Sequence, residues 1–93
     1  MPVLISAAPA LDWTIEILSP GQSVTKATKK ILRCLKHGSQ MGWLIAPADK
    51  AALIYQPQQE ISVLDEPDAV LPVPDFAENL AIPVENLFAL LLL

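Results

Sequence analysis

Residues 11–18 alternate between apolar and polar side chains, and this pattern constrains the fold more than any other feature of the sequence. The apolar side of an extended chain would hold Leu11, Trp13, Ile15 and Ile17. The polar side would hold Asp12, Thr14 and Glu16. A period of two in β-branched and aromatic residues predicts a strand with one buried face. The sequence Ser19-Pro20-Gly21 is expected to end it.

A helix is predicted after this strand, over residues 24–37. Its apolar and small residues recur at helical spacing and form one stripe: Val24, Ala27, Thr28, Ile31, Leu32 and Leu35. Ser23 is the expected N-cap, and His37 followed by Gly38 is typical of a helix C-terminus. We expect the stripe to cover the apolar side of the first strand.

Three more strands and a terminal helix follow. The strands are predicted at residues 43–46, 51–56 and 60–64, and the helix at residues 83–90. Prolines bracket residues 60–64 and mark an edge strand. The helical crossover is long enough to make the first two strands parallel. The predicted fold is therefore α+β, with an α/β-like crossover: a small mixed sheet with one amphipathic crossover helix.

Composition excludes two classes of protein. The chain has 93 residues, of which 53% are hydrophobic, so it is not a disordered polyelectrolyte. Its apolar runs are far shorter than the roughly 18 residues of a membrane span, and we expect no membrane association. Cys34 is the only cysteine and cannot form an internal disulfide, which favours the reducing cytoplasm.

Charge is distributed unevenly along the chain. The net charge is −4, yet residues 17–48 hold only basic charges: Lys26, Lys29, Lys30, Arg33 and Lys36. Residues 51–93 hold only acidic ones: Glu60, Asp65, Glu66, Asp68, Asp75, Glu78 and Glu85. The helix could thus attract anions such as DNA through Lys26, Lys29, Arg33 and Lys36. The alternative is an ordinary solvated helix face.

Few residues have the chemistry of a site. His37 is better explained as a helix cap, and Cys34 as a packing residue. Glu16 near the end of the first strand and Lys30 on the helix remain. A carboxylate that holds a metal ion and a lysine that stabilises developing negative charge are the minimum for metal-dependent phosphodiester cleavage. The alternative is a surface ion pair worth about 0–1 kcal/mol.

The same residues carry a resemblance to a known family. The segment from Asp12 through Glu16-Ile-Leu-Ser19-Pro20, then Lys30, Gly38 and Trp43-Leu-Ile-Ala-Pro47, resembles the Uma-type restriction endonuclease family of the PD-(D/E)XK nuclease superfamily. The likeness continues through Tyr55, residues 71–76, and Leu87-Phe88.

The resemblance implies a metal-dependent DNA endonuclease, with Mg²⁺ as cofactor and DNA as substrate. Glu16 would be the metal-binding and catalytic carboxylate. Leu18 stands where the superfamily's lysine would follow, so the resemblance assigns that role to Lys30. Asp12 also matches a recurrent aspartate, but four strand residues span about 13 Å, too far to share a cation with Glu16. Asp12 is therefore interpreted as a strand-start residue.

The sequence also departs from the family pattern. The upstream acidic residues of the family have no counterpart, Leu11 replaces a proline, and Ala46 replaces an aspartate. We therefore expect residues 1–93 to form one partial domain, the C-terminal half of a truncated restriction-endonuclease-like core, with residues 1–10 poorly matched. Activity would be weak or absent.

Two functions stay open at this point. The first is the metal-dependent endonuclease or its remnant. The second is a non-catalytic interaction module that retains half of a nuclease fold. Under either, we expect a homo-oligomer or a partner chain to cover an exposed sheet edge, because unpaired edges recruit other strands.

Overall fold

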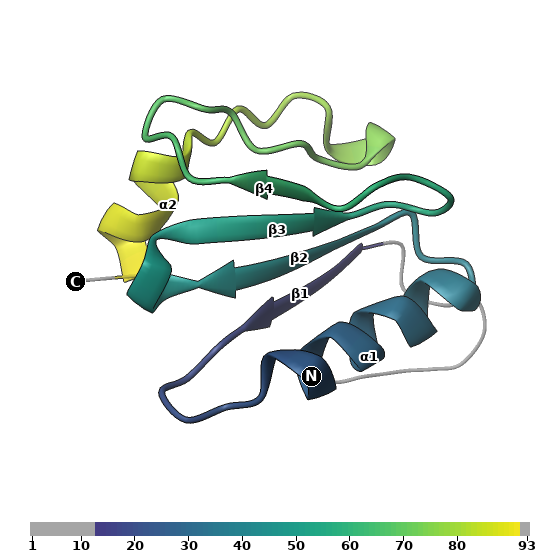
Figure 1. Cartoon of the computed structure of the whole chain (residues 1–93). Helices are drawn as coiled ribbons and strands as arrows, with labels where there is room; N and C mark the ends of the chain where they lie inside the picture. The colour runs from purple at the N-terminus through teal and green to yellow at the C-terminus, as the bar shows by residue number, and fades with distance from the viewer. Residues whose placement is uncertain (1–12, 92–93) are drawn as a thin grey trace.

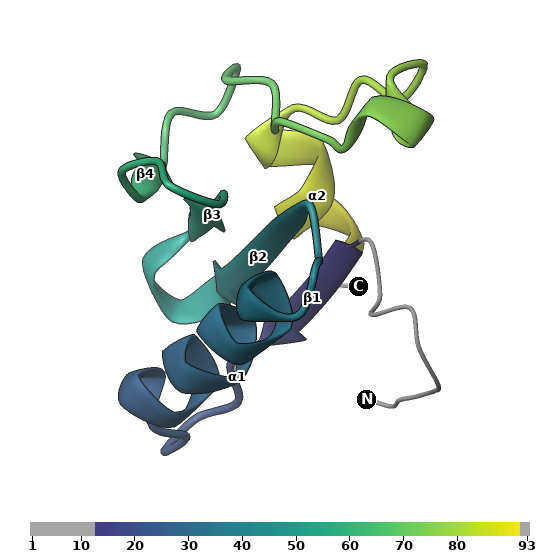
Figure 2. The ribbon, with the colours of Figure 1, turned by 90° about the vertical axis from the view of Figure 1, so that its right-hand side faces the viewer.

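A four-stranded sheet with one helix on each face forms the framework of this protein in the computed structural model, which describes residues 13–91 (Figure 1; Figure 2). The elements are β1 (Trp13–Ile17), α1 (Val24–Lys36), β2 (Met41–Ala46), β3 (Ala51–Tyr55), β4 (Ser62–Leu64) and α2 (Val84–Leu91), with 3₁₀ turns at Pro47–Asp49 and Asp75–Ala77. The predicted α+β class is confirmed. Leu11, Asp12 and the lead-in 1–10 lie outside the described residues.

The sheet is mixed, with the strand order β1-β2-β3-β4. β1 and β2 run parallel and are joined by α1, as the length of the crossover predicts. β2 and β3, and then β3 and β4, are antiparallel. In the β1–β2 register Glu16 lies opposite Leu44, so the candidate carboxylate sits on the strand beside the fully buried β2.

Helix α1 begins and ends where its capping residues predict. The Ser23 side chain accepts a hydrogen bond from the backbone N–H of Lys26, which satisfies one of the first free donors of the helix. His37 is the C-cap, and Gly38 follows it with φ +109°. Arg33 and Lys36 lie in the last turn, where positive charge suits the helix dipole.

Two apolar clusters lie on opposite faces of the sheet. The larger joins the sheet to α2 through Met41, Trp43, Ile45, Ala52, Ile54, Leu71, Val84 and Phe88. The smaller joins it to α1 through Ala27, Ile31, Leu44 and Tyr55. Successive strand residues face opposite ways, so β2 serves both clusters and is buried at all six positions. Within residues 13–91, neither helix has the length and apolar character needed to cross a membrane.

The prediction that the helix stripe covers the apolar side of the first strand is wrong. Thr14 and Glu16 lie on the α1 face, where they line a pocket with residues of that helix. The cause is steric. A Cβ at Gly42 would overlap the Ile31 side chain and lie 3.2 Å from Thr14 Cγ2, so the small residues of this face let α1 approach closely.

The apolar side of β1 faces the larger cluster instead. Trp13 packs edge-on against Trp43, with ring centroids 5.0 Å apart, and contacts Phe76 at 6.2 Å. Ile15 and Ile17 are only half covered, with 44% and 49% of their surface exposed. The apolar side of β1 is thus packed at its beginning and open at its end.

Candidate functional site

A pocket of about 270 Å³ lies between β1 and α1, and it contains both residues predicted to act chemically. Its lining consists of Thr14, Glu16, Lys30, Arg33 and Cys34. The strand supplies the first two by alternation, since residues two apart share a face. The helix supplies the other three, because positions i, i+3 and i+4 lie on one side of it. The pocket is therefore a direct product of the parallel β1–α1–β2 unit.

Glu16 and Lys30 form an ion pair across this pocket. The Lys30 Nζ lies 3.8 Å from the Glu16 Oε1. The Glu16 side chain is 14% exposed, whereas that of Lys30 is 59% exposed. A pair with one well-solvated partner adds at most about 1 kcal/mol to stability. Because its gain in stability is so small, the pair leaves the ammonium free to move toward a ligand.

Arg33 is a pocket residue that the sequence pattern placed only on the solvated face of the helix. It is exposed, as predicted, and it also lines the pocket one turn after Lys30. Cys34 and Thr14 line the same pocket and were not predicted to do so. The spacing of residues 30, 33 and 34 indicates that their side chains share one side of α1. That this side lines a pocket could be recognised only once β1 was known to present Thr14 and Glu16 to the helix.

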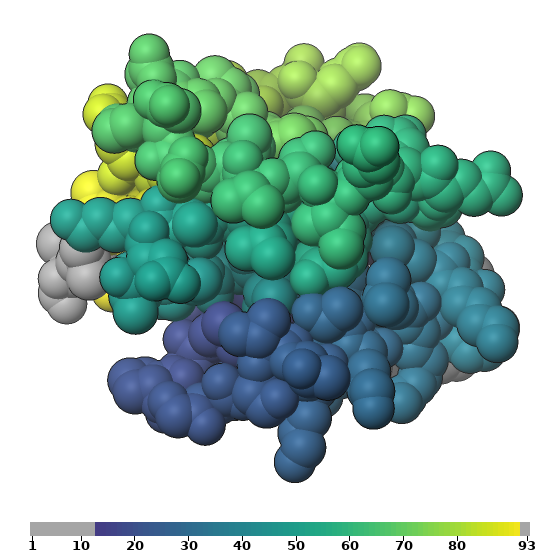
Figure 3. Space-filling model, viewed as in Figure 1, coloured from purple at the N-terminus to yellow at the C-terminus, as the bar shows by residue number. Residues whose placement is uncertain are grey.

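The other predicted DNA contacts lie outside this pocket. Lys26, Lys29 and Lys36 are exposed on α1, as the helical periodicity predicted. Seen from the side drawn in Figure 3, α1 lies at the opposite end of the molecule from the segment after β3, which carries most of the acidic residues. The basic residues of α1 and most of the acidic residues are therefore separated in space as well as in sequence.

The described residues do not make a fitting site for Mg²⁺. Mg²⁺ prefers an octahedral shell of oxygen ligands. The pocket offers one carboxylate, Glu16, and its lining also includes two cationic side chains, Lys30 and Arg33. No group of three or more metal-ligating side chains occurs within residues 13–91. Asp12, interpreted above as a strand-start residue, falls outside that range.

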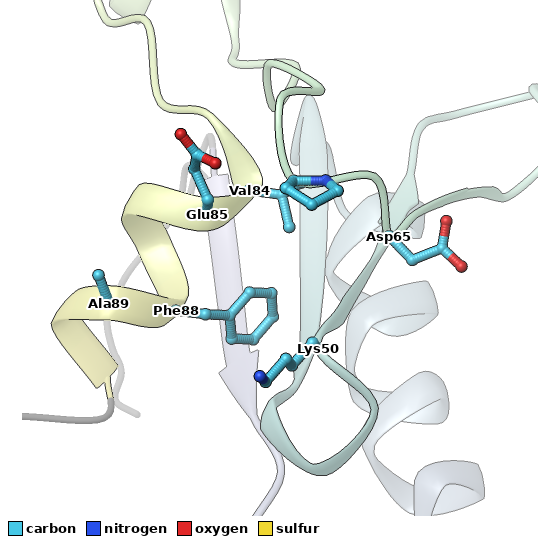
Figure 4. Close-up of a pocket in the computed structure, with 7 residues that line it drawn as sticks. Lys50, Asp65, Val84, Glu85, Phe88 and Ala89 are labelled. Atoms are coloured by element: carbon cyan, nitrogen blue, oxygen red, sulfur yellow. The ribbon is translucent and has the colours of Figure 1, made fainter.

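A second pocket, of about 260 Å³, lies between α2 and the sheet (Figure 4). Val84 and Phe88 form its apolar floor, and both are buried. Figure 4 shows the Lys50 side chain beside the Phe88 ring, while Glu85 and Asp65 lie on different sides of the pocket. Its polar groups do not converge, so it lacks the arrangement that fixes and polarises a substrate.

A third pocket, of about 520 Å³, lies where β1 and β2 end. Its lining comes from residues 18–21 and 46–49 and is largely apolar. Its one ionisable side chain is that of Asp49. Of the three pockets, the Glu16–Lys30 pocket therefore has the strongest case as a chemical site.

Comparison with known proteins places the chain in a family. The model of the Uma2 family, described as "Putative restriction endonuclease", matches residues 6–85. A crystal structure of "a putative nuclease belonging to DUF820" from Anabaena variabilis is 61% identical in sequence, with a TM-score of 0.84. The likeness covers 86% of this chain and 45% of that one, so the matched part is less than half of that relative. No curated protein matches the chain.

These comparisons include the residues of the Glu16–Lys30 pocket described above. The family match includes β1, α1 and β2, and therefore the whole lining of the Glu16–Lys30 pocket. At 61% identity, the likeness to the Anabaena structure extends well beyond a shared fold. Because the family model matches most of its residues, the chain belongs to the Uma2 family of restriction-endonuclease-like proteins.

Proposed function

We propose that this chain carries the strand–helix part of a DNA-cleaving site that acts on phosphodiester bonds. The observation that carries the proposal is the Glu16–Lys30 pair in a pocket of a Uma2-family chain. The family supports a nuclease-type function, and the pair supplies an acidic and a basic group within reach of one bound phosphate. DNA is the expected substrate.

The two side chains would have different roles. Lys30 is exposed enough to meet a phosphate oxygen, and its ammonium would stabilise the negative charge that develops during attack. Glu16 is largely buried and accepts hydrogen bonds only, so it would hold Lys30 in place and could orient a water molecule. Nuclease chemistry of this family implies a divalent cation. The described residues do not make a site for this cation.

Low activity is part of the proposal. Phosphodiester hydrolysis through metal ions uses several oxygen ligands, and the pocket contributes one carboxylate. The match to the Anabaena relative covers 45% of that protein's length. We therefore expect these 93 residues to bind DNA and to cleave it weakly or not at all.

A plasmid assay tests the cleavage part. The purified chain and its Glu16→Gln variant are incubated with supercoiled plasmid and either Mg²⁺ or Mn²⁺, and nicked product is followed over time. We expect no nicking that depends on Glu16. Rapid nicking that Glu16→Gln abolishes would overturn the proposal of low activity, whereas equal nicking by both proteins would come from a contaminant.

A binding assay tests the substrate. At low ionic strength, a fluorescent DNA duplex should bind the chain and be released as salt is raised, because contacts to phosphates dominate such binding. Absence of binding at low salt would refute a nuclease-type function for this chain. The proposed compartment is the cytoplasm, where the single thiol of Cys34 would stay reduced.

A second candidate function is self-association, and the edge of β1 favours it. β1 lies at one edge of the described sheet, with Ile15 and Ile17 about half exposed. The opposite edge, β4, has only three residues and is flanked by Glu60, Asp65 and Glu66. Short, acidic edges resist pairing with a second copy, whereas a five-residue edge with one apolar face resists it less. We therefore propose β1 as the surface through which two copies would meet.

A further inference from the structure

The Glu16–Lys30 pocket carries more positive than negative charge. Its ionisable side chains, apart from the Cys34 thiol, are one carboxylate and two cations, Lys30 and Arg33. Lys30 is paired with Glu16. Within residues 13–91, no carboxylate lies within 4.0 Å of Arg33 to compensate it. Among residues 13–91, one positive charge at the pocket therefore has no paired carboxylate, and it belongs to the guanidinium of Arg33.

The charge of the pocket lining determines whether the pocket favours a cation or an anion. A divalent cation would meet one carboxylate and two positive charges, so its binding would be opposed by Coulomb repulsion. An anion would neutralise the unpaired positive charge of Arg33. A guanidinium presents parallel N–H donors that match two oxygens of a phosphate, while an ammonium contacts a third as a point charge. The pocket volume of about 270 Å³ leaves room for a tetrahedral anion.

Arg33 and Lys30 are exposed like the other basic residues of α1, but of these residues only Arg33 and Lys30 line the pocket beside β1. Lys29 and Lys36 are exposed and do not line the pocket. A phosphate group bound to Lys29 or Lys36 would be surrounded by solvent. A phosphate group bound between Lys30 and Arg33 would lie against β1.

We propose that Arg33 and Lys30 together form a binding site for a single phosphate group, with Arg33 as its positioning residue. In DNA this group would be one phosphate of the backbone, and that identification rests on the proposed function. The anion site itself does not require cleavage. Arg33 thus fixes where a strand lies relative to Glu16, whereas the exposed lysines of α1 attract DNA in general.

The test uses inorganic phosphate as the probe. The chain labelled with ¹⁵N is titrated with phosphate at constant ionic strength, with chloride as the balancing and control anion. We expect the amide signals of Thr14, Glu16 and Cys34 and the Nε–H signal of Arg33 to shift with phosphate and not with chloride. Shifts confined to other parts of the chain, or equal shifts with chloride, would overturn the proposal.

Variants separate a specific site from general charge. Arg33→Ala should weaken phosphate binding at least tenfold, while Lys29→Ala, which removes the same charge outside the pocket, should change it less than twofold. Arg33→Lys keeps the charge but loses the planar guanidinium, so its phosphate affinity should lie between those of the two alanine variants. It also replaces Arg33→Ala in this test if Arg33→Ala does not fold. Equal losses in Arg33→Ala and Lys29→Ala would overturn the proposal.

Two further measurements keep this proposal distinct from the nuclease function. If phosphate binds in the pocket but a DNA duplex does not bind at low salt, the nuclease-type function fails and the anion site stands. If DNA binds and Arg33→Ala costs no more affinity than Lys29→Ala, the anion site fails and the function stands. Titration with Mg²⁺ alone should leave the pocket signals in place, and saturable shifts there would show a cation site instead.

Discussion

Gly42 is the residue that most directly controls how closely α1 packs on the sheet. A Cβ at this position would overlap Ile31 Cγ2, which belongs to a fully buried side chain in the smaller cluster. Gly42→Ala should therefore destabilise the fold by about 1–3 kcal/mol, the usual cost of overpacking. Urea unfolding followed by circular dichroism measures the change.

A double-mutant cycle identifies the cause. Ile31→Ala removes the overlapping atom, so Gly42→Ala should cost clearly less in that background than in the native chain. If Gly42→Ala costs the same in both backgrounds, the close approach of helix and strand does not explain the effect.

Thr28 and Tyr55 make a second link between α1 and the sheet. The Thr28 Oγ1 and the Tyr55 hydroxyl are 2.8 Å apart, and either can donate. Tyr55→Phe should cost about 0.5–1.5 kcal/mol, the net value of one such hydrogen bond. In the same unfolding assay, Thr28→Val should cost less when Tyr55 is already Phe. Strictly additive losses would mean that the bond contributes nothing.

Single residues also mark the limit of what the sequence could predict. An ion pair between Glu16 and Lys30 was the alternative to a chemical site, and it is observed, with 3.8 Å between their charged atoms. The role expected for each remains a prediction. Arg33 is exposed, as its place among the solvated lysines predicted, but its position in the pocket was not predicted, because helical spacing alone cannot reveal which neighbouring strand lies beside a residue. That information depends on packing between elements and enters only with the three-dimensional structure.

Among the elements, α1 carries the charge expected to meet DNA. Lys29→Glu combined with Lys36→Glu reverses two exposed charges and leaves the pocket lining unchanged. Duplex binding should weaken, and the slope of log affinity against log salt should fall by about 0.9 for each DNA phosphate that the variant no longer neutralises. Fluorescence anisotropy over a salt series measures both quantities.

Lys50→Glu is the matched control for this prediction. It makes the same change of charge as one of the two reversals, but on the loop between β2 and β3 and not on α1. Binding that is affected as much by Lys50→Glu as by one reversal on α1 would mean that overall charge, and not the helix, attracts DNA. Circular dichroism confirms that each variant remains folded.

The elements themselves followed well from local signals. Ser23 and His37 define the ends of α1, and prolines keep β4 short and at the edge, as the sequence indicated. The face of β1 that α1 covers could not be predicted in the same way. Alternation distinguishes two faces of a strand, and the bulkier one was assigned to the helix. Gly42 and Thr14 show why the helix packs on the face with small side chains.

At the scale of the whole molecule, the exposed edge of β1 predicts association of two copies. An antiparallel pairing centred on Ile15 would be self-complementary and would place Ile17 opposite the partner's Trp13. Light scattering over a concentration series should show a dimer or larger species. Ile17→Lys should shift the chain toward a monomer of 10.1 kDa.

Val63→Lys provides the comparison for that variant. Val63 lies on the other edge strand and is 58% exposed, close to the 49% of Ile17. The same substitution there should leave the association unchanged. A native chain that stays monomeric at all concentrations would contradict the proposal, as would an equal response of the two variants.

Glu16 lies on β1, beside the fully buried β2, and this position affects how readily the Glu16–Lys30 pocket opens. Regions with few buried contacts open locally at a lower free energy than the molecule as a whole. In hydrogen exchange, the amides of β2 should thus be the slowest, and those of β1 should exchange earlier through partial opening. A substitution could then disassemble the Glu16–Lys30 pocket while the melting temperature of the protein stays the same.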